Sequence, residues 1–410
     1  MPYYQAPQHN VVRSAALSIL VTDSMSTIAG EHKDAGTAAR RNYYPQRTPR
    51  FWHGMRFCAA VRLLAKNRFR IHPFRWGMTF MVLLCSAISS TLYLIVKLLH
   101  GRRIDQTNIS EPPIFIIGHW RSGTTLLHEL LVRDPRFAYP TTYECFAANH
   151  FVVSEWILPR MFWFLLPPKR PMDNMSAGFD RPQEEEIALC ALGAPTPYLR
   201  MAFPNHPPPY SEFYDMEGVN ANDLQRFKHL LTWFVKALTY YKKKRIVLKS
   251  PPNTGRIAVL ADIFPGAKFI HCVRDPCALF PSTRRTWEAL DHAQGFQLPN
   301  HEDLDEYIFD TLPRMYGGFE SQRSSVDPTS ICDVRYEDLA HDPVGQLQMV
   351  YEKLDIGGFE NVRAQIEEYV ESQKDYQPNR HELDPDTKAE ILRRWSDYGL
   401  KYGYCEPGDA

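Results

Sequence analysis

Short apolar runs alternate with segments of helical periodicity over the C-terminal three quarters of the chain. The runs that predict buried strands of a parallel sheet are 113–117, 137–140, 245–251, 267–276 and 331–339. The intervening segments that predict helices are 124–131, 224–241, 256–264 and 344–372. Apolar strands that alternate with helices predict an α/β fold of three layers, in which helices flank a central parallel sheet and the crossovers are right-handed.

The first hundred residues follow a different pattern. Residues 1–48 show no clear period and predict a loosely ordered arm. Residues 49–104 predict a helical segment, with an amphipathic helix over 50–66 and an uncharged apolar run over 77–96. We therefore expect three parts in the chain, of which 105–405 is the main domain.

The run 77–96 has about the 20 residues that a helix needs to cross a bilayer. The alternative is a hydrophobic helix packed on the outside of the domain. Lys and Arg are more frequent before the run than after it, so a spanning helix would leave the N-terminus in the cytoplasm, as in a single-pass type II protein. We expect a membrane-associated protein if the helix spans, and otherwise a cytoplasmic one.

Composition narrows the range of partners. Lys and Arg number 47 and balance 47 Asp and Glu, so no overall positive charge favours nucleic acid, and any site for an anion must be local. The eight cysteines form no Cys-x-x-Cys pair and no metal-binding spacing with histidine. This pattern predicts buried reduced thiols instead of a disulfide framework or a metal centre.

The most informative stretch follows the first apolar run of the main domain. The strand ends at Gly118, a tight loop follows, and a helix begins at Thr124. Backbone N–H groups and the dipole at the start of such a helix bind anions, and glycines let the backbone approach the ligand closely. Gly118 and Gly123 have the spacing of the nucleotide triphosphatase loop, but Thr124 replaces its lysine. The cation of this loop is Arg121, which predicts a ligand shorter than a triphosphate.

Three predicted strands end in a cation. Arg121 follows the first, and Lys249 and Arg274 stand at the ends of two later ones. Ligands of open parallel sheets bind beyond the carboxyl ends of the strands, so three cations there predict a ligand with more than one anionic group. Ser282 is expected in the first turns of the helix after Arg274, where both side chains would hold one phosphate. The alternative for Arg274 is a structural salt bridge with a neighbouring carboxylate.

Arg-Ser-Gly-Thr-Thr after an apolar strand resembles the 5′-phosphosulfate loop of the sulfotransferases that use 3′-phosphoadenosine-5′-phosphosulfate (PAPS). Leu-Lys-Ser-Pro-Pro at 248–252, Val-Arg-Asp-Pro at 273–276 and Val-Arg-Tyr-Glu-Asp-Leu at 334–339 extend the resemblance to roughly residues 112–400, closest to the bacterial and carbohydrate-type branch. The resemblance implies a P-loop-type fold, a metal-free reaction and PAP as product. The residues that we expect to bind PAPS are Arg121, Ser122, Gly123, Thr124, Thr125, Arg274, Ser282 and Arg380.

Sulfuryl transfer needs cations at the leaving phosphate and a base for the acceptor. Arg121 and Lys249 are our candidates for the first task. Glu144 is the first candidate for the base, because it follows the loop's helix and a short strand; Glu185 and His119 are the alternatives. The acceptor is expected to be a hydroxyl or amine of a carbohydrate, a lipid or another small molecule.

Two other functions remain open from the sequence. A kinase-like phosphotransferase would also use a phosphate-binding loop, although the missing loop lysine argues against it. A non-catalytic, membrane-anchored nucleotide-binding protein is the second alternative, and the intact cations at three strand ends argue against it.

Overall fold

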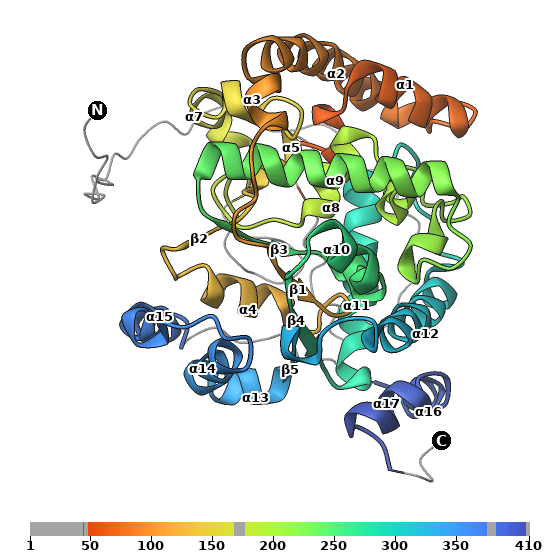
Figure 1. Ribbon diagram of the computed structural model, residues 1–410. Coiled ribbons are helices and arrows are strands. Elements are labelled where there is room, and N and C mark those ends of the chain that lie inside the picture. Colours follow the sequence, from red (N-terminus) through yellow and green to blue (C-terminus); the bar gives the residue numbers. More distant parts are fainter. Residues whose placement is uncertain (1–43, 45–47, 168–176, 375–382, 407–410) are drawn as a thin grey trace, which may run out of the picture. The chain divides into compact units, whose positions relative to one another are not determined.

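A parallel sheet lies at the centre of the computed structural model, which describes residues 44, 48–167, 177–374 and 383–406 (Figure 1). The strands are β1 (Ile114–Ile117), β2 (Phe137–Ala138), β3 (Arg245–Lys249), β4 (Lys268–Val273) and β5 (Ile331–Arg335). Across the sheet they follow the order β2, β3, β1, β4, β5, and every neighbouring pair is parallel. The predicted parallel sheet is confirmed, whereas most of the predicted arm 1–48 lies outside the described residues.

Alternate side chains of each strand enter opposite apolar layers. In β1, Phe115 and Ile117 belong to one buried cluster, and Ile114 and Ile116 to the other. All four are fully buried, as expected for a central strand with helices on both faces. Because both faces of β1 pack against apolar layers, the strand has no polar position.

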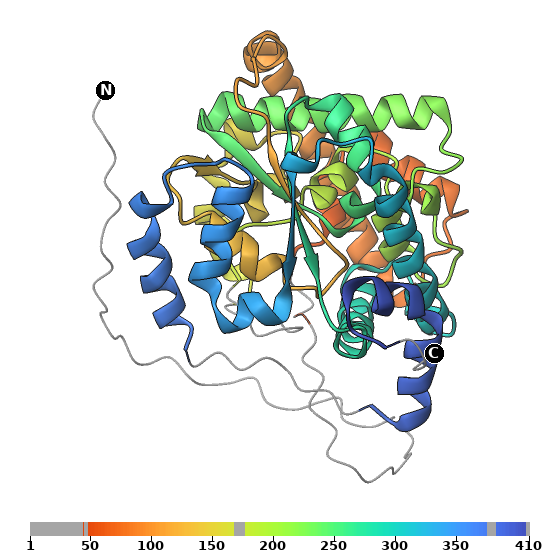
Figure 2. The same cartoon turned by 60° about the horizontal axis from the view of Figure 1, so that its bottom comes forward.

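Helices cover both faces of the sheet, so the predicted three-layer α/β fold is confirmed (Figures 1 and 2). One face carries α4 (Thr124–Leu131), α13 (Tyr336–His341), α14 (Pro343–Lys353) and α15 (Arg363–Ser372). The other carries α8 (Glu185–Leu192), α9 (Ala221–Lys242), α10 (Ile257–Ile263), α11 (Pro276–Gln294) and α12 (Leu304–Arg323), with α16 (Pro385–Arg394) and α17 (Ser396–Tyr402) packed on them. Short helices α5 (Thr142–Phe146), α6 (Phe151–Ser154) and α7 (Leu158–Phe162) precede α8.

The strand predicted over 331–339 is shorter than expected. It ends at Arg335, and Tyr336 begins α13. Glu337 and Asp338 lie in the first turn of this helix, where the helix dipole favours negative charge. The apolar residues of the run therefore belong to two elements.

The N-terminal helices share the core of the main domain. They are the 3-10 turn η1 (Phe51–Gly54), α1 (Phe57–Lys66), α2 (Trp76–Val96), the π-helical turn η3 (Lys97–Gly101) and α3 (Arg102–Asp105). Trp52 is fully buried and its Nε1 donates to the carbonyl of Gln294 at 2.7 Å. Residues from 42 onward form one compact unit, so 49–104 pack with 105–405.

The continuous helical stretch Pro73–Asp105 is long and apolar enough to cross a membrane by length and composition. In its most apolar window, 28% of the residues are buried inside the protein. One side of α2 packs on η1, α1 and α6. The single-pass type II arrangement remains a prediction.

All eight cysteines lie among the described residues, and none forms a disulfide.

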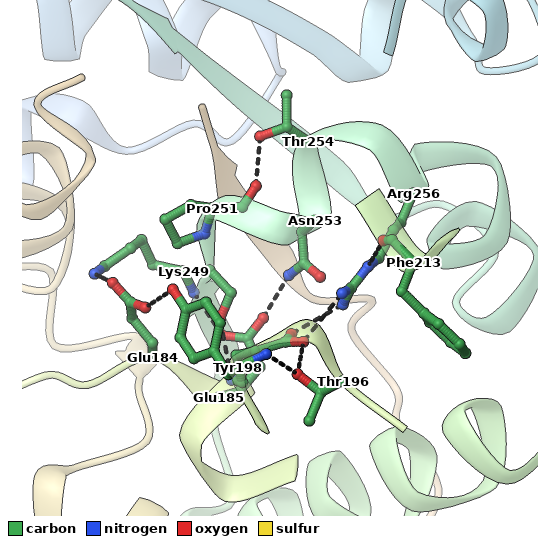
Figure 3. Close-up of polar contacts among 12 residues, drawn as sticks. Glu184, Glu185, Thr196, Tyr198, Phe213, Lys249, Pro251, Asn253, Thr254 and Arg256 are labelled. Carbon is green, nitrogen blue, oxygen red and sulfur yellow. Dashed lines mark hydrogen bonds and ion pairs between the residues drawn. The ribbon is translucent and has the colours of Figure 1, made fainter. Parts of the chain in front are cut away.

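Three consecutive glutamates connect the start of α8 to the end of β3 and the segment after it; Figure 3 labels the first two, Glu184 and Glu185. Glu184 pairs with Lys249 at 2.7 Å, Glu185 accepts from Asn253 at 2.5 Å, and Glu186 pairs with Arg256 at 2.9 Å. Asn253 and Arg256 belong to η7, the 3-10 segment Pro251–Arg256. The three contacts hold α8 against the carboxyl end of the sheet.

The Glu186–Arg256 pair is fully buried, and two guanidinium nitrogens donate to two carboxylate oxygens. Removing one partner of such a pair leaves a buried charge without compensation. We expect Arg256→Met to lower the free energy of unfolding by about 3–5 kcal/mol, measured by denaturant unfolding. The control is Lys228→Ala, which breaks the exposed pair with Asp262 and should cost at most about 1 kcal/mol. Equal losses in both variants would contradict this prediction.

Burial raises the pKa of Glu185 from 4.5 to about 7, and the charge of Glu186 adds to the effect. Because the folded pKa lies above the unfolded one, the stability that this carboxyl contributes is complete below about pH 4.5 and is lost as the pH rises through 7. Glu185→Gln stays neutral and should flatten the fall in the free energy of unfolding between about pH 5 and pH 8. Denaturant titrations at several pH values measure both slopes, and identical slopes would refute the assignment.

Candidate active site

The loop between β1 and α4 is a backbone cradle. Gly118 has φ +139° and Gly123 has φ +97°, in the region that favours glycine. A Cβ at Gly123 would lie 2.3 Å from a ring carbon of Tyr336, so the loop is packed tightly on this ring. Gly123 is the N-cap of α4 and no side chain caps the helix. The first N–H groups of α4 therefore remain available to an anion.

Side chains from the segments that follow β3 and β4 hold this loop in place. Gly118 N–H donates to Thr254 Oγ1 at 2.8 Å, and a guanidinium nitrogen of Arg274 donates to the carbonyl of Arg121 at 2.9 Å. Arg121 itself has φ +70°, and its Nε donates to Ser282 Oγ at 2.9 Å. A non-glycine residue in this conformation carries strain, which the contacts with Arg274 and Ser282 offset.

A cavity of about 1210 Å³ opens beside the loop. Polar and backbone groups from the strand ends form one part of its lining: Arg121, Gly123, Thr124, Thr125, Arg274 and Tyr336. Apolar side chains from η1, α5, α8, η5 (Pro197–Ala202) and α11 form another part: Phe51, Phe146, Ile187, Met201 and Leu290. The volume exceeds that of a typical site for one small molecule, which leaves room for two substrates side by side.

Glu184 lies in the lining of this cavity, next to the loop. Its two carboxylate oxygens accept hydrogen bonds from Lys249 Nζ at 2.7 Å and from the Tyr198 hydroxyl at 2.5 Å (Figure 3). Trp120 Nε1 donates in turn to the Tyr198 oxygen at 2.8 Å. The carboxylate retains 18% exposure, so it is oriented by fixed donors and still reaches the cavity.

Among the described residues, the cavity lining contains two carboxylates, Glu184 and Glu129. Glu129 of α4 is paired with Arg133, which lies in the turn just after the end of this helix. Glu184 is therefore the carboxylate that lies near a strand-end cation, Lys249.

The predicted site residues fall into four groups. Those that line the cavity are Arg121, Gly123, Thr124, Thr125 and Arg274. Those that lie one contact behind the lining are Ser122, whose Oγ donates to the carbonyl of His119, Ser282, which accepts from Arg121, and Lys249, which pairs with Glu184. Glu144, Glu185 and His119 are buried away from it, and Arg380 lies outside the described residues.

The structure does not bring Glu144 to this cavity. The side chain is fully buried at the start of α5, where it accepts from the Thr141 N–H at 2.7 Å and pairs with Lys242 Nζ at 2.9 Å. Thr141 and Glu144 form a capping box, a Thr-x-x-Glu pattern that the sequence already contains. The contacts seen are those of a helix cap.

The two alternative bases are also enclosed. His119 is fully buried, and burial lowers the pKa of its imidazole to about 3, which makes it a weak base. Glu185 accepts hydrogen bonds from the backbone N–H of Lys249 and from Asn253, with no exposure. Glu184 was not among the predicted bases. The sequence shows three consecutive glutamates at the start of α8, and only their tertiary partners distinguish one from another.

No group of three or more His, Cys, Asp or Glu side chains suited to a metal ion occurs within the described ranges. Around the loop, the described side chains offer an anion cradle, cations and one oriented carboxylate.

Comparisons with known proteins identify the relatives of this chain. A profile of the group described as "Sulfotransferase family" matches residues 112–361. The "Omega-hydroxy-beta-dihydromenaquinone-9 sulfotransferase Stf3" proteins of Mycobacterium bovis and Mycobacterium tuberculosis are each 42% identical over 353 residues, which covers 86% of this chain and 91% of theirs.

Two solved structures share the fold. Sulfotransferase STF9 from Mycobacterium avium has a TM-score of 0.58 at 14% identity, covering 85% of this chain and 96% of that one. Sulfotransferase STF1 from Mycobacterium tuberculosis H37Rv has a TM-score of 0.56 at 16% identity, covering 83% and 92%. Since the family profile spans more than half of the chain and the relatives match nearly all of it, the protein belongs to the sulfotransferase family and is a sulfotransferase enzyme.

Proposed function

We propose that the protein transfers a sulfuryl group from PAPS to the terminal hydroxyl of an apolar lipid, of the hydroxylated isoprenoid quinone class. The observation that carries this proposal is the single cavity in which the anion cradle and an apolar wall face the same space. The relatives at 42% identity are named for an omega-hydroxylated dihydromenaquinone acceptor, which supports the lipid class. Membership of a family of sulfotransferases argues against the kinase-like and the non-catalytic alternatives.

The cavity fits the donor on two observations. The uncapped start of α4 offers backbone N–H groups to a 5′-phosphosulfate. Arg274 Nε is buried without a hydrogen-bond partner, which leaves a donor for a second anionic group, the 3′-phosphate. PAPS supplies an activated sulfuryl group, and the residues of this chain bind and orient its two anionic ends.

Arg121 and the N–H groups at the start of α4 are proposed to stabilise the charge that grows on the leaving phosphate. Glu184 is proposed to accept the proton of the acceptor hydroxyl, with Lys249 and Tyr198 orienting its carboxylate. A new bond forms between the acceptor oxygen and sulfur, the bond from sulfur to the phosphate oxygen breaks, and the proton ends on Glu184. The products are PAP and a sulfate ester.

Exchanging Glu184 for Gln keeps its size and removes its basicity. We expect kcat to fall by about 10²–10⁴-fold, because general base catalysis typically contributes that much, while PAP affinity stays within a few-fold. Transfer of ³⁵S from labelled PAPS to farnesol, a water-dispersible isoprenoid alcohol, measures the turnover. Glu144→Gln is the matched comparison and should retain turnover when folded. Loss of turnover in Glu144→Gln with normal turnover in Glu184→Gln would restore Glu144 as the base.

The 3′-phosphate assignment predicts a preference for PAP over AMP. A charge-assisted hydrogen bond contributes about 1.5–3 kcal/mol, so PAP should bind roughly 10–100-fold more tightly in calorimetry. Arg274→Ala should remove most of that preference. Arg393→Ala, which removes an exposed arginine paired with Glu390, is the control and should keep it. Equal binding of PAP and AMP by the unaltered protein would contradict the assignment.

A further inference from the structure

The outward side of α2 and η3 is largely apolar. The large apolar side chains exposed on it are Trp76, Phe80, Met81, Leu84, Ile88, Leu94, Ile95, Leu98 and Leu99. Their spacing of three and four residues places them on one stripe of the helix. We call this stripe the outer face of α2. Large contiguous apolar patches are rare on soluble monomers and mark contact sites.

The inward side of the same helix carries the small polar residues. Thr79, Ser86 and Ser89 are buried there, and Ser89 Oγ donates to the carbonyl of Gly54 at 2.8 Å. A surface helix in water has the opposite arrangement, with polar residues outward. The reversed pattern indicates that the outer face meets an apolar environment.

The charged residues around α2 indicate the kind of surface that its outer face contacts. Residues 49–104 contain ten Lys and Arg and no Asp or Glu, in a chain whose overall charge is zero. Exposed basic side chains stand at both ends of α2: Arg62, Lys66, Arg68 and Arg70 before it, and Lys97, Arg102 and Arg103 after it. An apolar stripe flanked by cations is complementary to an anionic lipid surface.

A second exposed apolar segment spans residues 156–165. It begins with Trp156, includes α7 and the turn η4 (Trp163–Leu165), and exposes the side chains of Trp156, Met161, Trp163 and Phe164. The segment follows α6, which packs on α2. Trp side chains concentrate at the boundary between headgroups and acyl chains. Leu166 and Pro167, the next residues, line the cavity, so the surface borders the site.

We propose that the protein docks on an anionic lipid bilayer through the outer face of α2 together with α7 and η4, with α2 lying in the interface and not crossing the bilayer. The inward side of α2 packs on η1, α1 and α6, and a spanning helix would have to give up this packing. In Figure 1, α2 and α3 lie outside α9 at the top of the view, and none of the helices within the described ranges lies above α2 there.

Docking also places the cavity close to the lipid phase. Phe51 of η1 lines the apolar part of the cavity, and η1 packs directly on α2. A lipid hydroxyl would thus need to travel a short way from the bilayer to the carboxylate of Glu184. This last step rests on the proposed function, whereas docking itself does not.

Vesicle flotation of the purified full-length protein tests the docking. Vesicles of phosphatidylcholine with about 30% phosphatidylglycerol should bind at least about tenfold more protein than pure phosphatidylcholine, and added salt should reduce the difference. The double variant Phe80→Glu with Leu84→Glu should lose binding. Leu400→Glu, an exposed apolar position on α17, is the matched control and should keep it. Flotation of the double variant like the unaltered protein, or no flotation with either vesicle, would overturn the proposal.

Trypsin treatment of inverted membrane vesicles from an expressing bacterial host separates docking from spanning. A docked helix leaves both basic flanks, 62–70 and 97–103, on the outside and open to cleavage. Protection of the flank after α2 would overturn the proposal in favour of a type II span.

PAP affinity and transfer to farnesol are also measured on the double variant Phe80→Glu with Leu84→Glu, and both should be unchanged. Loss of lipid binding by the double variant with retained PAP binding supports docking. Absence of PAP binding by the unaltered protein would contradict the proposed function and leave the docking proposal unaffected.

Discussion

The site depends on how one turn at the start of α8 accommodates three neighbouring carboxyl groups. Residues 184–186 bring three carboxyl groups to the start of α8, and each would cost several kcal/mol if it were left ionised and unpaired at that depth. The segment 249–256 supplies a donor to every one of them, and two of these donors are cations. Satisfying all three therefore sets the position of α8 at the end of the sheet. Glu184, the first of the three, is the carboxylate that lines the cavity.

Strand order brings the remaining groups together. β3 and β4 flank β1 on its two sides, although more than 100 residues separate β1 from either of them in the chain. Lys249 at the end of β3 and Arg274 just after β4 thus lie beside the loop that follows β1. Arg274 also contacts that loop's carbonyl and stacks on Tyr336, so the anion cradle and the cations form one unit.

Local patterns predicted the sheet and the loop, because β-branched runs and glycine spacing act over a few residues. Tertiary partners decided the rest. Glu144 and Glu184 both lie near the start of a helix. Glu144 pairs with Lys242 and is fully buried, whereas Glu184 pairs with Lys249 and keeps part of its side chain exposed to the cavity. Residues 49–104 were expected as a separate segment, whereas the burial of Trp52 depends on Gln294, 242 residues away. No local pattern contains such a contact.

The position of η1 has a consequence for the donor itself. Phe51 forms part of the cavity wall while its neighbour Trp52 is anchored in the core, so the N-terminal helices close one side of the reacting space. An activated sulfuryl group in an open site reacts with water, and a closed apolar wall suppresses that hydrolysis. Under the proposed function, the N-terminal segment that carries the outer face of α2 would thus also shield the sulfuryl donor from water, and damage to this segment would raise hydrolysis relative to transfer.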